Sequence, residues 1–98
     1  MTIEMKKNGG ALTVSLEGRL DTVTSPDLEK ALSDALSDVT ELVFDLSKLE
    51  YVSSAGLRIL LTAQKTMNAR GKMVVKNVGE TVAEIFEVTG FSDILTIE

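Results

Sequence analysis

Alternating apolar and polar positions at the start of the chain predict a β-hairpin. Ile3 and Met5 alternate with polar residues over positions 2–7, and a second alternating run follows over positions 11–17. Between the two runs lies Asn8-Gly9-Gly10, a combination typical of tight hairpin turns. We therefore expect these two runs to pair as antiparallel strands.

Three later segments place apolar residues at the spacing of an amphipathic helix. The first begins at Ser25-Pro26, where a capping serine and a first-turn proline mark a helix start. The expected helices cover residues 25–38, 54–69 and 81–89.

Short apolar runs between these helices are typical of buried strands. They cover residues 41–46 and 73–75, and residues 94–97 fit either a short edge strand or an extended tail. Strands separated by helices need crossover connections and pair in parallel. The expected fold class is therefore α/β: one domain over residues 1–98, with a mixed sheet that has an N-terminal hairpin followed by parallel crossovers, flanked by helices.

Composition narrows the possible settings of this domain. The chain has 98 residues, 44% of them hydrophobic and 26% charged, which suits a single globular core. No apolar run approaches the ~18 residues of a membrane span, and the N-terminal segment is too polar for a signal peptide, so membrane insertion is not expected. The absence of cysteine agrees with a cytoplasmic protein. A net charge of −5, with no basic cluster beyond Lys6-Lys7, argues against a nucleic-acid partner.

The same composition limits the chemistry. Without histidine or cysteine the chain has no Ser-His-Asp triad, no thiol nucleophile and no ordinary zinc site. It also lacks the glycine-rich loops that bind nucleotide phosphates. We therefore expect a protein that is not an enzyme, with no catalytic residues, no metal and no cofactor.

The most informative segment runs from residue 45 to residue 61. A buried-looking strand is expected to end in a polar hinge at Asp45 and Ser47, after which a short loop delivers Ser53 and Ser54 to the first turn of a helix. A helix start has unpaired N–H groups and favours anions, so a hydroxyl there can cap the helix or carry a phosphate. The spacing alone leaves both interpretations open.

The strand, Asp-x-Ser, the short loop, Tyr-Val-Ser-Ser-Ala-Gly-Leu and the Leu-rich helix together resemble the STAS domain of bacterial anti-sigma-factor antagonists. Weaker matches follow in the right order along the chain: Gly18-Arg19-Leu20-Asp21, Lys72–Asn77, Phe86, Thr89, Gly90, Phe91 and Ile94. In that family the phosphoacceptor lies two residues before the Gly-Leu pair, which implies Ser54. Ser53 stands where well-known members often have Asp, and it is the second choice.

The resemblance implies a partner-switching function. The unphosphorylated domain would bind an anti-sigma factor with serine kinase activity and so free a sigma factor. The kinase would then phosphorylate Ser54, and a serine phosphatase would reverse the modification. Two alternatives are a STAS subunit of a lipid or anion transport assembly, and an enzyme that uses Ser54 as nucleophile with help from a lysine or an aspartate.

The expected contact surface surrounds the serine loop. Asp45 is expected to accept hydrogen bonds from the backbone near Ser53 and Ser54, the alternative being that it positions a catalytic group. Ser47 is expected to help position the same loop. Ile59 is expected to face away from the core beside a cation, as part of a docking surface. The expected partner-binding residues are Asp21, Thr22, Thr24, Ser53, Ala55, Gly56, Arg58 and Ile59.

Overall fold

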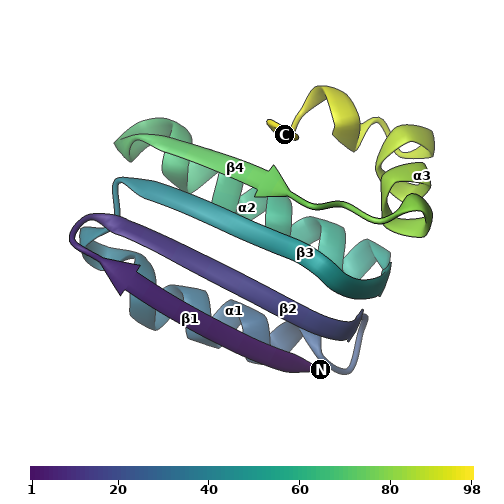
Figure 1. The fold of residues 1–98 in the computed structure, drawn as a ribbon, viewed down its shortest axis with the longest axis horizontal. Helices are drawn as coiled ribbons and strands as arrows, with labels where there is room; N and C mark the ends of the chain where they lie inside the picture. Colours follow the sequence, from purple (N-terminus) through teal and green to yellow (C-terminus); the bar gives the residue numbers. More distant parts are fainter.

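In the computed structural model, which describes residues Met1–Glu98, a four-stranded sheet carries two long helices on one face (Figure 1). The strands are β1 (Thr2–Asn8), β2 (Ala11–Leu20), β3 (Glu41–Val52) and β4 (Lys72–Lys76). The helices are α1 (Ser25–Ala35), α2 (Ser54–Arg70) and α3 (Glu80–Val88), with short 3₁₀ turns at Leu36–Asp38 and Phe91–Asp93. No helix of this fold combines the length and the hydropathy that a membrane-spanning helix needs.

The strands lie in the order β1-β2-β3-β4, with β1 antiparallel to β2 and the other two pairs parallel. The predicted mixed sheet, with a hairpin followed by parallel crossovers, is confirmed. Because β2 and β3 are parallel, both end at the same side of the sheet, and α1 and α2 begin there (Figure 1). We call this side the carboxyl edge.

β3 is twelve residues long and extends well beyond the predicted end at residue 46. Its buried positions are spaced by two as far as Leu46 and then by three, at Leu49 and Val52. The register with β2 shifts at the same places, so β3 carries an extra residue at each of two bulges. The bulges keep the apolar residues on the core side although the simple alternation is lost.

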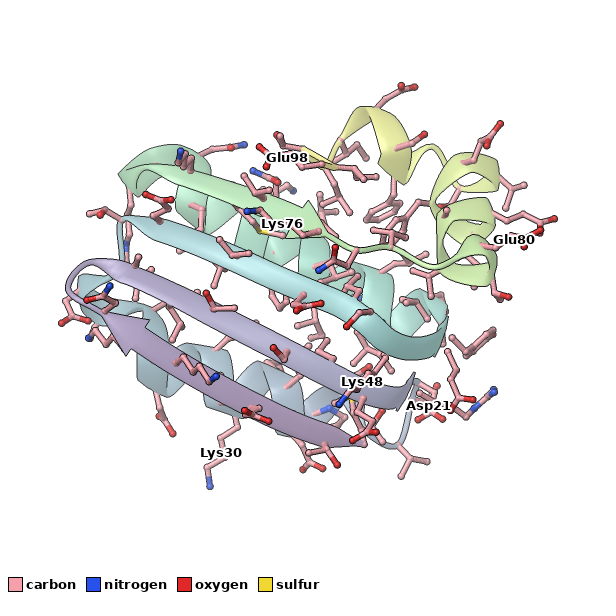
Figure 2. The ribbon with its side chains drawn as sticks, in the orientation of Figure 1. Asp21, Lys30, Lys48, Lys76, Glu80 and Glu98 are labelled. Atoms are coloured by element: carbon pink, nitrogen blue, oxygen red, sulfur yellow. The ribbon has the colours of Figure 1, made fainter.

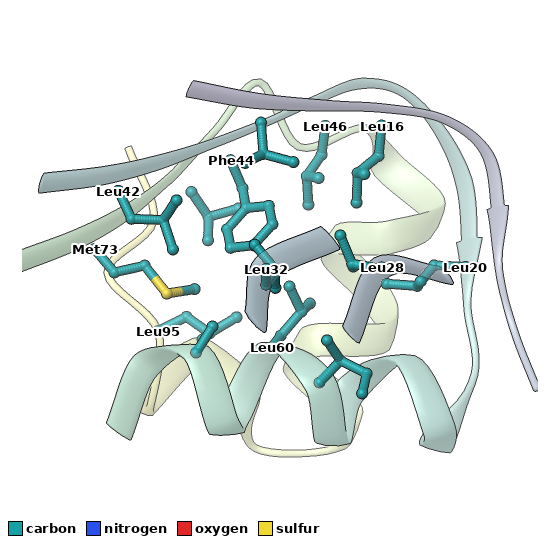
Figure 3. Packing of buried hydrophobic residues seen from close by; sticks show 14 of the residues in the cluster. Leu16, Leu20, Leu28, Leu32, Leu42, Phe44, Leu46, Leu60, Met73 and Leu95 are labelled. Carbon is teal, nitrogen blue, oxygen red and sulfur yellow. The ribbon is translucent and has the colours of Figure 1, made fainter. Parts of the chain in front are cut away.

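The core lies between the sheet and the two long helices (Figure 3). Leu16 of β2 and Phe44 of β3 point from the sheet toward Leu28 of α1 and Leu60 of α2, and all four are at most 1% exposed. Complete burial of side chains this large is worth about 1.5–3 kcal/mol each. The carboxyl edge therefore rests on a well-packed layer.

The C-terminal segment lies along the outer side of β4. The Val75 N–H donates to the carbonyl oxygen of Thr96 at 2.8 Å, and the Glu98 N–H donates to the carbonyl oxygen of Val75 at 2.9 Å. Ile97 and Val75 form an isolated parallel bridge, and Glu98 lies near Lys76 (Figure 2). The segment thus pairs with β4 at one point, short of a full edge strand.

Candidate functional site

Two chain segments meet at the carboxyl edge of the sheet. Leu20 pairs with Val52 in the parallel register, and the Ser53 N–H donates to the carbonyl oxygen of Leu20 at 2.8 Å. This contact brings the loop from β2 to α1 beside the turn from β3 to α2. Asp21 and the two candidate serines, 33 residues apart in sequence at the extremes, therefore lie in one region of the surface.

The two serines occupy different positions in the helix start. Ser53 is the N-cap of α2: it is half-buried, and its hydroxyl accepts a long hydrogen bond of 3.4 Å from the Gly56 N–H. Ser54 is the first residue of the helix and is exposed. Ser53 thus has a structural contact, whereas the Ser54 hydroxyl is open to a second protein.

Gly56 brings the helix start close to β2. A Cβ atom at this position would lie 2.7 Å from Leu20 Cγ and 2.9 Å from the Leu20 carbonyl oxygen, which is too close for any side chain. Gly56 is itself buried, so the structure does not support its expected role as a partner-binding residue. It contributes by allowing α2 to begin against the end of β2.

The loop from Asp21 to Thr24 is fixed by its own hydrogen bonds. The Asp21 carboxylate accepts from the Val23 N–H at 3.0 Å and the Thr24 N–H at 3.1 Å. The Thr24 hydroxyl donates to the Arg19 carbonyl oxygen at 2.7 Å and accepts from the Asp21 N–H. The hydrogen bond from the Thr24 backbone is the main reason that the pKa of Asp21 lies below its ordinary value. Asp21, labelled in Figure 2, thus remains ionised and holds this loop in place.

Sequence reasoning missed two features of this loop. Val23 is 83% exposed, more than any other large apolar residue in the chain. The Arg19 guanidinium lies 4.4 Å from the centre of the Tyr51 ring, and its Nε is 3.9 Å from the Asp21 carboxylate. A single valine within Asp-Thr-Val-Thr, between a strand and a helix, was the available signal for an apolar residue held in solvent.

The predicted role of Asp45 and Ser47 in positioning the serine loop is wrong. The Asp45 carboxylate accepts from the Ser47 N–H at 3.0 Å and from the Asn77 side chain at 3.2 Å. The first of these bonds is the main cause that lowers the pKa of Asp45. Because β3 continues for several residues beyond Asp45, the carboxylate stays at the first bulge of the strand, away from its end.

The expected exposure of Ile59 is also wrong, because only 8% of this residue is exposed. α1 and α2 lie side by side on the same face of the sheet, so α2 has two buried sides. Leu60 faces the sheet, and Ile59 lines a groove of about 660 Å³ between the helices, together with Pro26 and Leu32. Arg58, by contrast, is exposed as expected.

The exposed and half-buried residues at the carboxyl edge form one candidate surface, which we call the docking surface. Its members come from the α1 loop and from the first turns of α2: Asp21, Thr22, Val23, Thr24, Ser53, Ser54, Ala55 and Arg58.

Comparison with known proteins places this arrangement in a family context. The sequence model of the STAS domain family matches residues 2–98 of this chain. BtrV of Bordetella bronchiseptica, named as an anti-sigma factor antagonist, is 36% identical, and the alignment covers 99% of this chain and 85% of BtrV. The anti-sigma-B factor antagonist of Staphylococcus aureus is 27% identical, with 99% of this chain and 92% of that protein covered. The crystal structure of an anti-sigma factor antagonist from Mycobacterium paratuberculosis superimposes with a TM-score of 0.88 at 29% identity, covering 98% of this chain and 83% of that one.

Proposed function

The chain belongs to the STAS domain family, and from this membership we propose that it is an anti-sigma factor antagonist controlled by phosphorylation of Ser54. In its unphosphorylated form the domain binds an anti-sigma factor and thereby frees a sigma factor. The anti-sigma factor is a serine kinase that phosphorylates Ser54, and a serine phosphatase reverses the modification. The observation that carries the proposal is the exposed Ser54 at the start of α2, beside the fixed loop of Asp21.

Magnitudes favour a switch that acts at the contact and leaves the fold unchanged. Phosphoserine adds about −1.5 to −2 charges at neutral pH. At the start of α2 this charge is stabilised by roughly 0.3–1 kcal/mol per unit. Within a docked interface, one buried unpaired charge costs about 3–5 kcal/mol, which weakens binding a hundredfold or more. The phosphate is therefore compatible with the free domain and incompatible with the complex.

Phosphopeptide mapping tests the acceptor. With ATP and a kinase that is purified from the native cell together with this protein, we expect phosphate on Ser54 in the parent protein and in Ser53→Ala, and none on Ser54→Ala. The Ser53 variant is the matched control, since it removes the neighbouring hydroxyl and leaves the acceptor. A label on Ser53, Ser47 or a threonine would refute the assignment.

The switch itself is tested by comparing phosphorylated and unphosphorylated protein. We expect the same circular dichroism spectrum, an equal or slightly higher melting temperature, and an affinity for the anti-sigma partner that is at least about a hundredfold lower. A backbone change in NMR spectra that extends beyond the residues adjoining Ser54 would contradict exclusion at the contact and indicate an allosteric switch.

A charge reversal at Arg58 tests how far the docking surface extends along α2. Arg58→Glu should weaken partner binding while changing the free energy of unfolding by about 0.5 kcal/mol or less, because the side chain is exposed. Lys65→Glu makes the same charge change two turns further along α2 and should leave binding nearly unchanged. Loss of binding in both variants would mean that partner binding depends on the net charge of α2 and not on a contact at Arg58.

We further propose that the domain is not an enzyme. The Asp21 carboxylate, in the neighbouring loop at the carboxyl edge, is already engaged by two backbone N–H groups, and the chain has no histidine to act as a general base. The test is turnover of acyl and phosphoryl esters by the parent protein and by Ser54→Ala. Turnover that depends on Ser54 would refute this part of the proposal.

A further inference from the structure

The helix that carries Ser54 has an unusual charge pattern for this acidic chain. α2 contains Arg58, Lys65 and Arg70 and no Asp or Glu over its 17 residues. α1 and α3 each have an acidic residue in the first turn, Asp27 and Glu80. The start of α2 is thus the only one of the three α-helix starts without an acidic residue in its first turn, although a negative charge would be favourable there.

Arg58 is placed to meet a negative charge on Ser54. The two residues are four positions apart on one helix and both are exposed, so they share a face and are neighbours on it. Side chains of a helix lean toward its N-terminus, which carries the Arg58 guanidinium toward the turn of Ser54. Arg58 takes part in none of the four ion pairs of the structure.

The other nearby arginine is already engaged. The Arg19 guanidinium is stacked on Tyr51 at 4.4 Å and lies near the Asp21 carboxylate, which is ionised. A phosphate on Ser54 would therefore find Arg58 free and Arg19 occupied.

We propose that Arg58 binds the phosphate of phosphorylated Ser54 within the same helix, and that it is available to the partner only in the unphosphorylated form. This inference rests on the proposed function, because it presumes that Ser54 is the phosphoacceptor. An acidic group that precedes a cation by four residues has the more favourable orientation along a helix. The planar guanidinium also matches two phosphate oxygens at once. One modification then changes two parts of the docking surface: it adds a dianion at Ser54 and withdraws the cation at Arg58.

A titration of the phosphate tests this pairing without any partner protein. Phosphoserine is incorporated at position 54 during translation by stop-codon suppression, and its ³¹P chemical shift is followed from pH 4.5 to pH 8 at low salt. The second phosphate pKa is ordinarily about 6, and a paired guanidinium lowers it. Arg58→Gln should raise this pKa by about 0.2–0.4 pH unit relative to the parent phosphoprotein. Arg58→Lys should fall between the two, because lysine keeps the charge but lacks the planar fork.

Arg19→Gln is the matched control, because it removes an exposed arginine near the site that is held by other groups; its phosphate pKa should equal that of the parent. Equal pKa values in the parent and in Arg58→Gln would overturn the pairing and leave the proposed function standing. Conversely, a failure of the unphosphorylated protein to bind an anti-sigma factor would refute the proposed function and would not alter the titration. A larger shift in Arg19→Gln than in Arg58→Gln would assign the phosphate to Arg19 and also overturn the proposal.

Discussion

α1 and α2 begin side by side at the carboxyl edge of the sheet, but the two helix starts are built from different groups. The start of α1 has the Asp21 carboxylate in front of it and Asp27 in its first turn. The start of α2 has only the hydroxyls of Ser53 and Ser54. The first is supplied with negative charge permanently, and the second is neutral.

This contrast between the two helix starts shows how a folded domain can carry a switch. The carboxylate at the α1 start is tied to two backbone N–H groups, so this loop keeps one shape. The α2 start can gain charge through a modification that the fold accommodates, because a helix N-terminus favours anions. Under the proposed function, the α1 start therefore provides a fixed part of the docking surface, and the α2 start provides a charge beside it that phosphorylation of Ser54 can change.

The largest expected effect comes from the contact that joins the two starts. In Gly56→Ala the new methyl group meets Leu20, including its carbonyl oxygen at 2.9 Å, so either α2 or the end of β2 must move. We expect a loss of about 1–3 kcal/mol in the free energy of unfolding, measured by urea denaturation. Gly79→Ala is the control, since a Cβ there meets nothing within 4 Å. Equal stability of the two variants would show that the helix starts are not tightly joined.

The next largest effect is expected at the start of α1, which carries the charge of Asp21. Asp21→Ala removes the acceptor for the Val23 and Thr24 N–H groups, and it should lower the urea midpoint by less than Gly56→Ala does. Hydrogen exchange should become faster at Val23 and Thr24 and stay unchanged at Gly56. Faster exchange at both helix starts would mean that the two do not behave as separate units.

Lowering the pH should reproduce part of the effect of Asp21→Ala, because protonation weakens the same hydrogen bonds to Val23 and Thr24. The pKa of Asp21 is lower in the folded protein than its ordinary value, so its stabilising effect is complete above the unfolded pKa of about 3.9. The effect is lost as the pH falls through the lower, folded value. The amide shifts of Val23 and Thr24 should therefore titrate below about pH 4, whereas the amide of Gly56, bonded to a hydroxyl, should not follow them. A midpoint at or above 3.9 would contradict the hydrogen-bonding account.

The smallest effect on stability is expected from a permanent charge placed at the neutral start of α2. Ser53→Asp should raise the free energy of unfolding by about 0.3–1 kcal/mol at neutral pH and low salt, because the carboxylate caps the helix and interacts with its dipole. Ser53→Asn is the control that supplies a cap without charge. Equal stability of the Asp and Asn variants would mean that the α2 start does not respond to charge and would contradict the account given for the two helix starts.

Much of this architecture follows from local sequence patterns. The hairpin, the order of the elements and the place of Ser53 and Ser54 at a helix start depend on turn residues, periodicity and caps, which act over a few neighbouring positions. These expectations agree with the structure. The length of β3 could not be predicted in this way, because its two bulges change the spacing of buried residues from two to three.

The wrong predictions for Ile59 and Asp45 have a different cause. Ile59 looks exposed on a helical wheel with one buried stripe, but α1 covers a second side of α2. Asp45 looks like the end of a strand, but its partners are set by a bulge and by Asn77 of a distant connection. Both depend on which elements lie beside one another, and single-helix or single-strand patterns do not contain that information.

The pairing of the C-terminal segment with β4 affects how molecules of this protein meet one another. An outer strand with free N–H and C=O groups is a template for aggregation, because a second chain can pair with it. At Val75 both groups are bonded to Thr96 and Glu98, so β4 does not offer them. The opposite outer strand, β1, ends in the exposed Lys6-Lys7-Asn8, and lysines on an edge strand discourage such pairing. Each outer strand thus carries a feature that discourages pairing with a second copy, and the carboxyl edge remains available for recognition.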